Sequence, residues 1–106
     1  MAKFLVQFSY TEEGLQGLIK EGGSKRMEAA QQLVESLGGK LEANYFSFGE
    51  YDGFIIMDGM DNIDAAAAAM IVNASGAIKT KTTVLLTPEE VDQATQKHGS
   101  YRPPGK

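Results

Sequence analysis

The residues best suited to chemistry lie together in one polar segment, Glu50-Tyr51-Asp52, between Gly49 and Gly53. Two carboxylates and a phenol can act as acid, base or ligand contacts where burial raises the pKa of a carboxyl group. Tight turns select the same residue types, because Asp and Gly satisfy backbone groups and adopt turn conformations. Adjacent residues in a strand or turn also point in different directions, which disfavours a joint catalytic role. The pattern favours a structural turn, with Asp52 kept as a candidate base.

His98 is the only histidine of the chain and therefore its only side chain with an unperturbed pKa near neutrality. It precedes Gly99 near the expected end of a helix, where the helix dipole favours a cation and glycine commonly ends the helix. This placement favours a C-terminal capping role over catalysis, and His98 is the second candidate base. The chain has no cysteine, which excludes thiol nucleophiles, disulfides and Cys-ligated metals.

Three aspartates, Asp58, Asp61 and Asp64, recur at every third position. A calcium loop instead needs alternate oxygen ligands, a central glycine and a closing glutamate. Asp61 as a helix N-cap and Asp64 in the first turn explain the spacing without a cation. We therefore expect neither a metal nor a cofactor. Lys79 and Lys81 share one face of an expected edge strand, where lysines commonly guard against edge-to-edge aggregation.

Length and composition indicate a single globular domain. The chain has 106 residues, of which 42% are hydrophobic and 23% charged, and a net charge of -4. An acidic chain lacks the basic face that phosphate neutralisation needs, which disfavours nucleic-acid binding. The first apolar run is too short for a secretion signal, and none approaches the about 20 apolar residues of a membrane helix. We expect a cytoplasmic protein with neither a nucleic-acid nor a membrane partner.

Hydrophobic periodicity predicts the order of elements, since apolar residues recur every second position in a half-buried strand and with a 3.6-residue period in a helix. A last helix is indicated by Thr87 as cap, Pro88 at the first helical position and Glu90 completing a capping box. The domain is expected to span residues 1–99, followed by a flexible tail over residues 100–106. The earlier elements are a strand over residues 3–10, a short helix broken at 21–23, a longer helix over 24–37, strands over 40–48 and 53–58, a loop over 58–62, a helix that Gly76 ends, and a strand over 77–86.

This order predicts an α+β, ferredoxin-like βαββαβ protomer with an antiparallel four-stranded sheet. Right-handed crossovers place both long helices on one face of that sheet. The strand over residues 53–58 is apolar on both sides, with Phe54 and Ile56 on one and Ile55 and Met57 on the other. A sheet covered on one side only should alternate apolar and polar residues. A second copy packed sheet to sheet is the simplest further cover, so we expect a homodimer or a larger assembly of copies.

The order of elements, together with particular residues, resembles the GYD-domain family of small bacterial and archaeal proteins. The resemblance covers about residues 3–92. It implies a dimeric α+β barrel, in which ferredoxin-like protomers pair through their sheets, and it implies no established activity. The matching segments are Phe4-Leu5-Val6, Lys25-Arg26-Met27-Glu28-Ala29-Ala30, Gly38-Gly39-Lys40, Gly49-Glu50-Tyr51-Asp52 and the run from Thr80 to Leu86.

Two classes of function remain open. The first is a binding or regulatory module whose cavity between the sheets holds a small, partly apolar molecule. The second is a cofactor-free enzyme of the monooxygenase or isomerase type, with Asp52 or His98 as base. Because no nucleophile–base pair is recognisable, the sequence favours the first class. The candidate ligand-binding residues are Tyr45, Tyr51, Asp52, Gln7 and Thr82.

Overall fold

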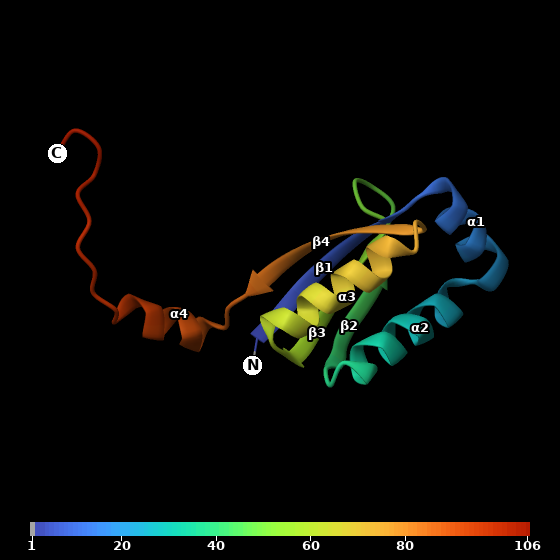
Figure 1. The fold of residues 1–106 in the computed structure, drawn as a ribbon, viewed down its shortest axis with the longest axis horizontal. Helices are drawn as coiled ribbons and strands as arrows, with labels where there is room; N and C mark the ends of the chain where they lie inside the picture. The colour runs from blue at the N-terminus through green and yellow to red at the C-terminus, as the bar shows by residue number, and fades with distance from the viewer. Residues whose placement is uncertain (1) are drawn as a thin grey trace.

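A computed structural model of the protein describes residues 2–106 and contains one antiparallel sheet of four strands. The strand order is β2-β3-β1-β4 (Figure 1), so β2 and β4 are the edge strands. This is the predicted ferredoxin-like arrangement, with α1 and α4 as additional short helices. The elements in chain order are β1 (Ala2–Tyr10), α1 (Glu12–Glu21), α2 (Gly23–Ser36), β2 (Lys40–Phe46), β3 (Gly53–Met60), α3 (Asn62–Ala74), β4 (Ile78–Leu85) and α4 (Pro88–Thr95).

Local signals set the starts of α1, α3 and α4 as predicted. Thr11 caps α1 and Asp61 caps α3, and each side chain accepts a backbone N–H from the first turn of its helix. Before α4, Thr87 and Glu90 form the reciprocal capping box. Gly22 separates α1 from α2 with a φ of +89°, a conformation that a side chain would strain. The break is shorter than expected, so α2 begins immediately after Gly22.

β3 continues beyond the predicted strand and ends at Met60. The sequence predicts a loop over residues 58–62, because Asp, Gly and Asn favour turns. In the structure, Met60 pairs with Ala2 of β1, and its side chain is 0% exposed. The pairing of β1 with β3 shifts register between Ala2 and Phe4. Opposite this shift, Gly59 adopts a φ of +75°. Burial of Met60 in the core outweighs the local turn preference, and the loop prediction is wrong at this end of the strand.

The strand register assigns each residue to one of two faces of the sheet. Phe4 and Met57 are paired on the side of the helices, and each is 2% exposed. Leu5 and Ile56 are the next pair along and therefore lie on the opposite side, together with Phe54. We call this uncovered side the open face. Its residues on the four strands include Lys3, Leu5, Gln7, Tyr45, Phe54, Ile56, Lys79 and Lys81.

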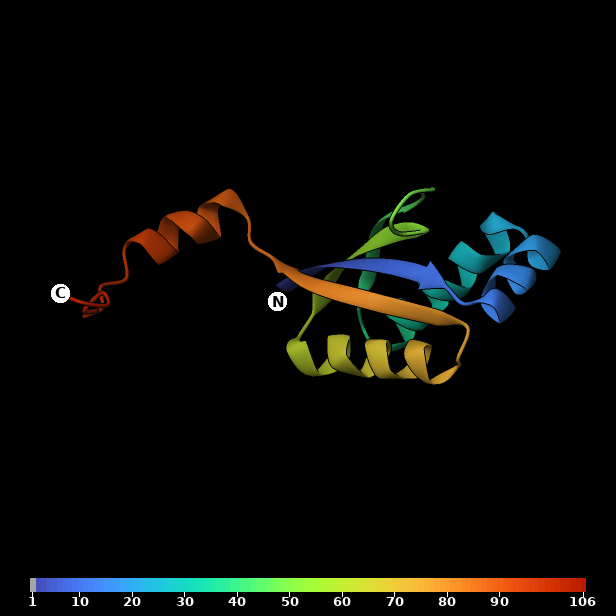
Figure 2. The ribbon, with the colours of Figure 1, turned by 90° about the horizontal axis from the view of Figure 1, so that it is seen from above.

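Two helices cover the other face of the sheet. α2 packs along β2 and α3 along β4 (Figures 1 and 2). Val34 of α2 and Ala65 and Ala68 of α3 join the buried residues of the central strands in one core. None of the helices described in residues 2–106 is both long and apolar enough to cross a lipid bilayer.

The C-terminal arm, residues 86–106, extends away from the sheet (Figures 1 and 2). The radius of gyration is 16.9 Å, whereas a compact chain of this length has a value of about 13 Å. Every residue of α4 is exposed, including Val91 at 45%. The capping signals of α4 therefore form as predicted. The part of the protomer that the structure describes does not bury the Val91 side chain of this helix.

A matched pair of glycines in α1 tests the packing of this helix. A Cβ on Gly14 would overlap the carbonyl oxygen of Ala77, whereas a Cβ on Gly17 would meet open space. Since alanine favours a helix over glycine by about 1 kcal/mol, Gly17→Ala should raise the free energy of unfolding by about 0.5–1 kcal/mol. Gly14→Ala should lower it by about 1–3 kcal/mol, the usual cost of overpacking. Urea unfolding of both variants measures these changes, and a stabilised Gly14→Ala protein would contradict the close contact.

Candidate functional site

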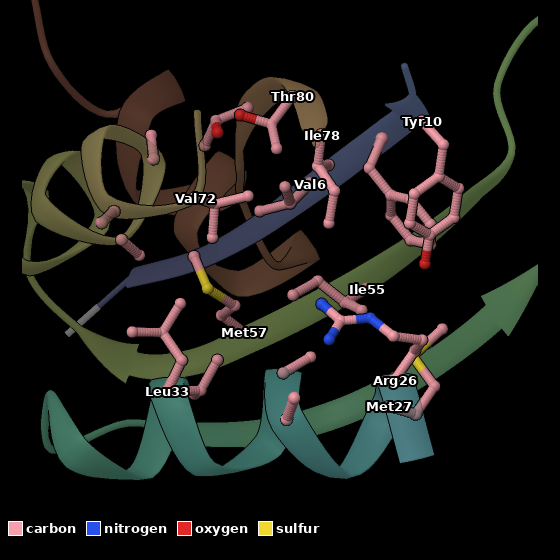
Figure 3. A pocket seen from close by; sticks show the side chains of 18 residues that line it. Val6, Tyr10, Arg26, Met27, Leu33, Ile55, Met57, Val72, Ile78 and Thr80 are labelled. Carbon is pink, nitrogen blue, oxygen red and sulfur yellow. The ribbon is translucent and has the colours of Figure 1, made fainter. Parts of the chain in front are cut away.

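An apolar cleft of about 130 Å³ lies between the two covering helices and the sheet (Figure 3). Its floor is formed by the central strands, with Val6 and Phe8 from β1 and Ile55 and Met57 from β3. Apolar cavities of about 150 Å³ accept a molecule of the size of benzene. The cleft therefore has room for one ring or a short alkyl chain.

Small side chains keep this cleft open. α2 borders it with Ala29 and Ala30, and α3 borders it with Ala65, Ala68 and Ala69. A methyl group is too short to reach the facing helix, so each helix packs on the sheet while the space between the two helices is left unfilled. The sequence predicts that the alanine run of α3 serves close packing. Ala65 and Ala68 do belong to the core, and the same run also forms one wall of the cleft.

Two of the polar residues that line the cleft, Arg26 and Tyr10, lie at one end of it, whereas Thr80 and Thr82 of β4 line it elsewhere. In Figure 3, the Arg26 guanidinium extends from the first turn of α2 and the Tyr10 phenol from the end of β1, both near Ile55. Burial raises the pKa of Tyr10 above its ordinary value of 10.0, and the Arg26 guanidinium opposes that shift. The phenol is therefore a neutral hydrogen-bond donor at physiological pH. Arg26 carries the one formal charge among the lining residues that the structure describes.

Asp52 holds the loop between β2 and β3 against β1. Its Oδ2 accepts the backbone N–H of Tyr10 at 2.7 Å, and its own N–H donates to the carbonyl of Phe8 at 2.8 Å. Ser47 closes the loop, because its N–H donates to the Asp52 carbonyl at 2.8 Å and its hydroxyl to the Tyr51 carbonyl at 2.9 Å. These bonds support the structural interpretation of the turn.

Substitutions at Asp52 separate the role of its shape from the role of its charge. Asp52→Ala removes the charged acceptor of the Tyr10 N–H and should lower the free energy of unfolding by about 1.5–3 kcal/mol. Asp52→Asn keeps an acceptor oxygen and should cost about 1 kcal/mol or less. Glu50→Ala in the same loop is the exposed control, with an expected change within about 0.5 kcal/mol. Urea denaturation measures all three, and an unchanged Asp52→Ala protein would contradict a structural role for the carboxylate.

A family model described as GYD domain matches residues 4–95, from β1 to the end of α4. The chain belongs to the GYD domain family. A search of curated proteins found no match, and a search of solved structures found none. The family match names no reaction or ligand for this GYD domain.

The other ligand-binding residues predicted from the sequence lie in different parts of the GYD domain. Gln7 and Tyr45 are on the open face, where the Tyr45 side chain is 63% exposed and its ring centroid lies 5.6 Å from that of Phe54. Thr82 is on the opposite face and lines the cleft. Tyr51 is half-buried in the loop beside Asp52. Within one protomer, these residues do not surround a single cavity.

His98 lies beyond the last helix of the GYD domain. α4 ends at Thr95, with Gln96 as its C-cap, and His98 is exposed in the segment that follows. The prediction that His98 caps the helix is therefore wrong, because the helix ends before reaching it.

β2 is shorter than the predicted strand over residues 40–48 and ends at Phe46.

The three regularly spaced aspartates have separate roles. The Nζ of Lys3 lies 3.3 Å from Oδ2 of Asp58, and this hydrogen bond lowers the pKa of the Asp58 carboxyl group. Asp61 accepts the backbone N–H of Asp64 at 2.8 Å as the cap of α3. Within residues 2–106, no three His, Cys, Asp or Glu side chains lie close enough together to hold a metal ion.

Sequence reasoning missed the polar end of the cleft. Alternation places Tyr10 on the same face of the first strand as Phe4, Val6 and Phe8, and Arg26 enters only as part of a segment that resembles the family. A signal was present, because Arg26 precedes Ala30 and Leu33 at helical spacing and so interrupts the apolar stripe of α2 with a charge. Nothing in the sequence connects that position with Tyr10, which lies on another element.

Proposed function

We propose that this GYD-domain protein is a homodimeric module that binds one small, largely apolar molecule in the cleft between α2, α3 and the sheet. The cleft itself carries the proposal. Protein interiors are normally close-packed, and an unfilled apolar space forfeits the dispersion contacts of its walls. A ligand of about 130 Å³ would restore those contacts. This site lies on the helix side of the sheet, whereas a cavity between two sheets would lie on the open face.

The positions of the candidate bases support binding over turnover. Neither Asp52 nor His98 lines the cleft, and the Asp52 carboxylate is engaged by the N–H of Tyr10. Among the lining residues that the structure describes, Tyr10 is the one acid, and its raised pKa keeps the phenol protonated, so that almost no phenolate is present to act as a base near neutrality. These observations favour a binding or regulatory module over a cofactor-free monooxygenase or isomerase.

The open face supports the dimer. Leu5, Phe54 and Ile56 form its apolar centre, and neither covering helix lies on that side. At one end of the face, the Nζ of Lys3 lies 2.8 Å from Oε2 of Glu42, which would form a polar rim at that end of the apolar centre. A two-fold contact through this face buries the same patch on both copies and closes the assembly. It also leaves the cleft of each protomer accessible on the far side.

The C-terminal arm gives a second, independent support for association. α4 has eight residues, and a helix of that length is marginal in water without a packing partner. It carries carboxylates at Glu89 and Asp92, whereas Lys79 and Lys81 lie at the opposite end of β4. A two-fold axis perpendicular to β4 would bring the acidic arm of one copy to the basic start of β4 in its partner.

The outer side of α3 supports assembly beyond a dimer. Ile63 and Met70 lie two turns apart on this side and are 78% and 67% exposed. A helix that is apolar all round is normally covered on all sides. Pairing of dimers through α3 would cover these side chains.

Filling the cleft tests the proposed function. Ala69 borders the cleft, whereas Ala66 of the same helix is exposed on its outer side. Benzyl alcohol should shift the methyl NMR signals of the cleft, and Ala69→Leu should weaken its binding at least about tenfold. Ala66→Leu is the matched control and should bind like the unmodified protein. The proposal is overturned if benzyl alcohol leaves the methyl signals of the cleft unshifted. It is also overturned if benzyl alcohol binds the folded Ala69→Leu protein as tightly as the unmodified protein.

A further inference from the structure

The two ends of the cleft differ in polarity. Arg26 and Tyr10 lie at the end near the start of α2, and Leu33 and Met57 lie toward the other end (Figure 3). A molecule that matches this cleft has one polar group and an apolar body. A molecule with polar groups at both ends would leave one of them desolvated against apolar walls.

The charge of Arg26 is only partly balanced within the protomer. Its Nη1 lies 3.5 Å from Oε2 of Glu21, which is longer than a strong charge-assisted hydrogen bond. Glu21 is not among the residues that line the cleft, and its side chain is 46% exposed. A guanidinium group has five N–H donors in a planar fork. Arg26 therefore retains donors for a group inside the cleft.

The start of α2 favours a negative charge beside Arg26, although the Glu21 and Asp52 carboxylates act on the neighbouring Tyr10 phenol. α2 has no acidic residue in its first turn, and no side chain within residues 2–106 caps its N-terminus. The positive end of the helix dipole therefore adds to the potential of Arg26. The neutral Tyr10 phenol supplies one further donor. No carboxylate lines the cleft in the part of the chain that the structure describes.

We infer that the ligand is a small apolar monocarboxylate, with one aromatic ring or a short alkyl chain. Its carboxylate accepts hydrogen bonds from Arg26 and Tyr10, and its apolar part lies against Leu33 and Met57. A planar carboxylate matches the guanidinium fork, and a single arginine balances a single negative charge. A dianion such as a phosphate monoester would place a second negative charge against apolar walls, which carry no positive charge to balance it. This assignment rests on the proposed function of the cleft.

Three probes of one shape and different charge test the assignment. Benzoate, benzyl alcohol and benzylammonium share a ring and differ in carrying a negative, a neutral and a positive group. Titration calorimetry of the full chain should show benzoate binding at least about tenfold more tightly than benzyl alcohol. Benzylammonium should bind more weakly than both, because Arg26 repels it.

Charge variants distinguish an anion site from a structural ion pair. Arg26→Met should abolish the preference for the anion, so that the folded variant binds benzoate no more tightly than benzyl alcohol. Lys25→Met, on the exposed side of α2, removes the same charge and should leave the preference for benzoate intact. Glu21→Gln should strengthen benzoate binding a few-fold, because the carboxylate that competes for Arg26 is lost. If the pair with Glu21 serves structure alone, Glu21→Gln leaves benzoate binding unchanged or weakens it, and the assignment is wrong.

The outcomes separate this inference from the proposed function. Equal binding of all three probes, each weakened by Ala69→Leu, would overturn the carboxylate assignment and support the cleft as a binding site. A benzoate preference that persists in folded Arg26→Met protein would also overturn the assignment. Failure of all three probes to bind would overturn both.

Discussion

We expect Ile56→Lys to give a folded monomer, and Ile55→Lys to prevent the protomer from folding stably. The two residues are adjacent and identical in type, but they lie on opposite faces of β3. Ile56 pairs with Leu5 on the open face, whereas Ile55 pairs with Val6 and packs against the core beside the cleft. A lysine at position 56 would place a charge in the interface of each copy and raise the dissociation constant of the dimer at least about 100-fold.

A lysine at position 55 acts on the protomer itself. It would place an ammonium group between the apolar floor of the cleft and the guanidinium of Arg26. Desolvation and repulsion together should cost about 3 kcal/mol or more, a large part of the stability of a small domain. The Ile55→Lys protein should lose the cooperative unfolding transition that circular dichroism measures.

Sedimentation velocity and circular dichroism together check this pair of variants. Ile71→Lys, at a position 53% exposed on α3, is the matched control and should remain folded and dimeric. If the unmodified protein sediments as a stable, folded monomer at micromolar concentration, the dimer is refuted. If Ile55→Lys and Ile56→Lys have the same effect, the assignment of the two faces is refuted instead.

The second large effect is expected at Met60. Its side chain is 0% exposed, and a Cβ on Gly39 would overlap its side-chain atoms, which shows how closely the chain packs over it. Met60→Ala should lower the free energy of unfolding by about 2–5 kcal/mol, because it removes buried atoms and leaves a cavity. Such a loss at a position that local propensity assigns to a loop would show that Met60 belongs to the core.

Met70→Ala is the control for this change. It makes the same substitution on the outer side of α3, where the side chain is 67% exposed, and should alter stability by less than about 0.5 kcal/mol. Guanidinium unfolding should be compared at one protein concentration, at which sedimentation shows no assembly beyond a dimer, since association raises apparent stability. Similar losses for the two variants would contradict the contrast in burial.

Local sequence determined the order of elements and most helix ends. Thr87 and Glu90 illustrate the reason, because the atoms of a capping box belong to residues three positions apart. Such contacts form within one turn of helix and do not depend on the rest of the fold. His98 shows the limit of these signals. A glycine after it favours a helix end, but no part of the protomer within residues 2–106 buries α4 and could extend it that far.

The sequence determined only in part which residues lie on each face of the sheet. Alternation showed that Phe54 and Ile56 lie opposite Ile55 and Met57, since successive side chains in a strand point to opposite sides. It did not show which pair faces the helices, because both pairs are apolar. The register with β1 decided this, by placing Met57 beside Phe4 in the core.

The tertiary structure alone decided the candidate site. Arg26 and Tyr10 are ordinary residues of a helix and a strand, and they line the same end of the cleft because α2 packs on the sheet with its first turn on the side where β1 ends. The cleft beside them exists because the alanines of α2 and α3 are too small to fill the distance between two helices that each pack on the sheet. Caps and alternation depend on neighbours along the chain and can therefore be recognised in a sequence. A cavity depends on the distance between elements that are remote in the chain, and only the packing of the whole fold sets that distance.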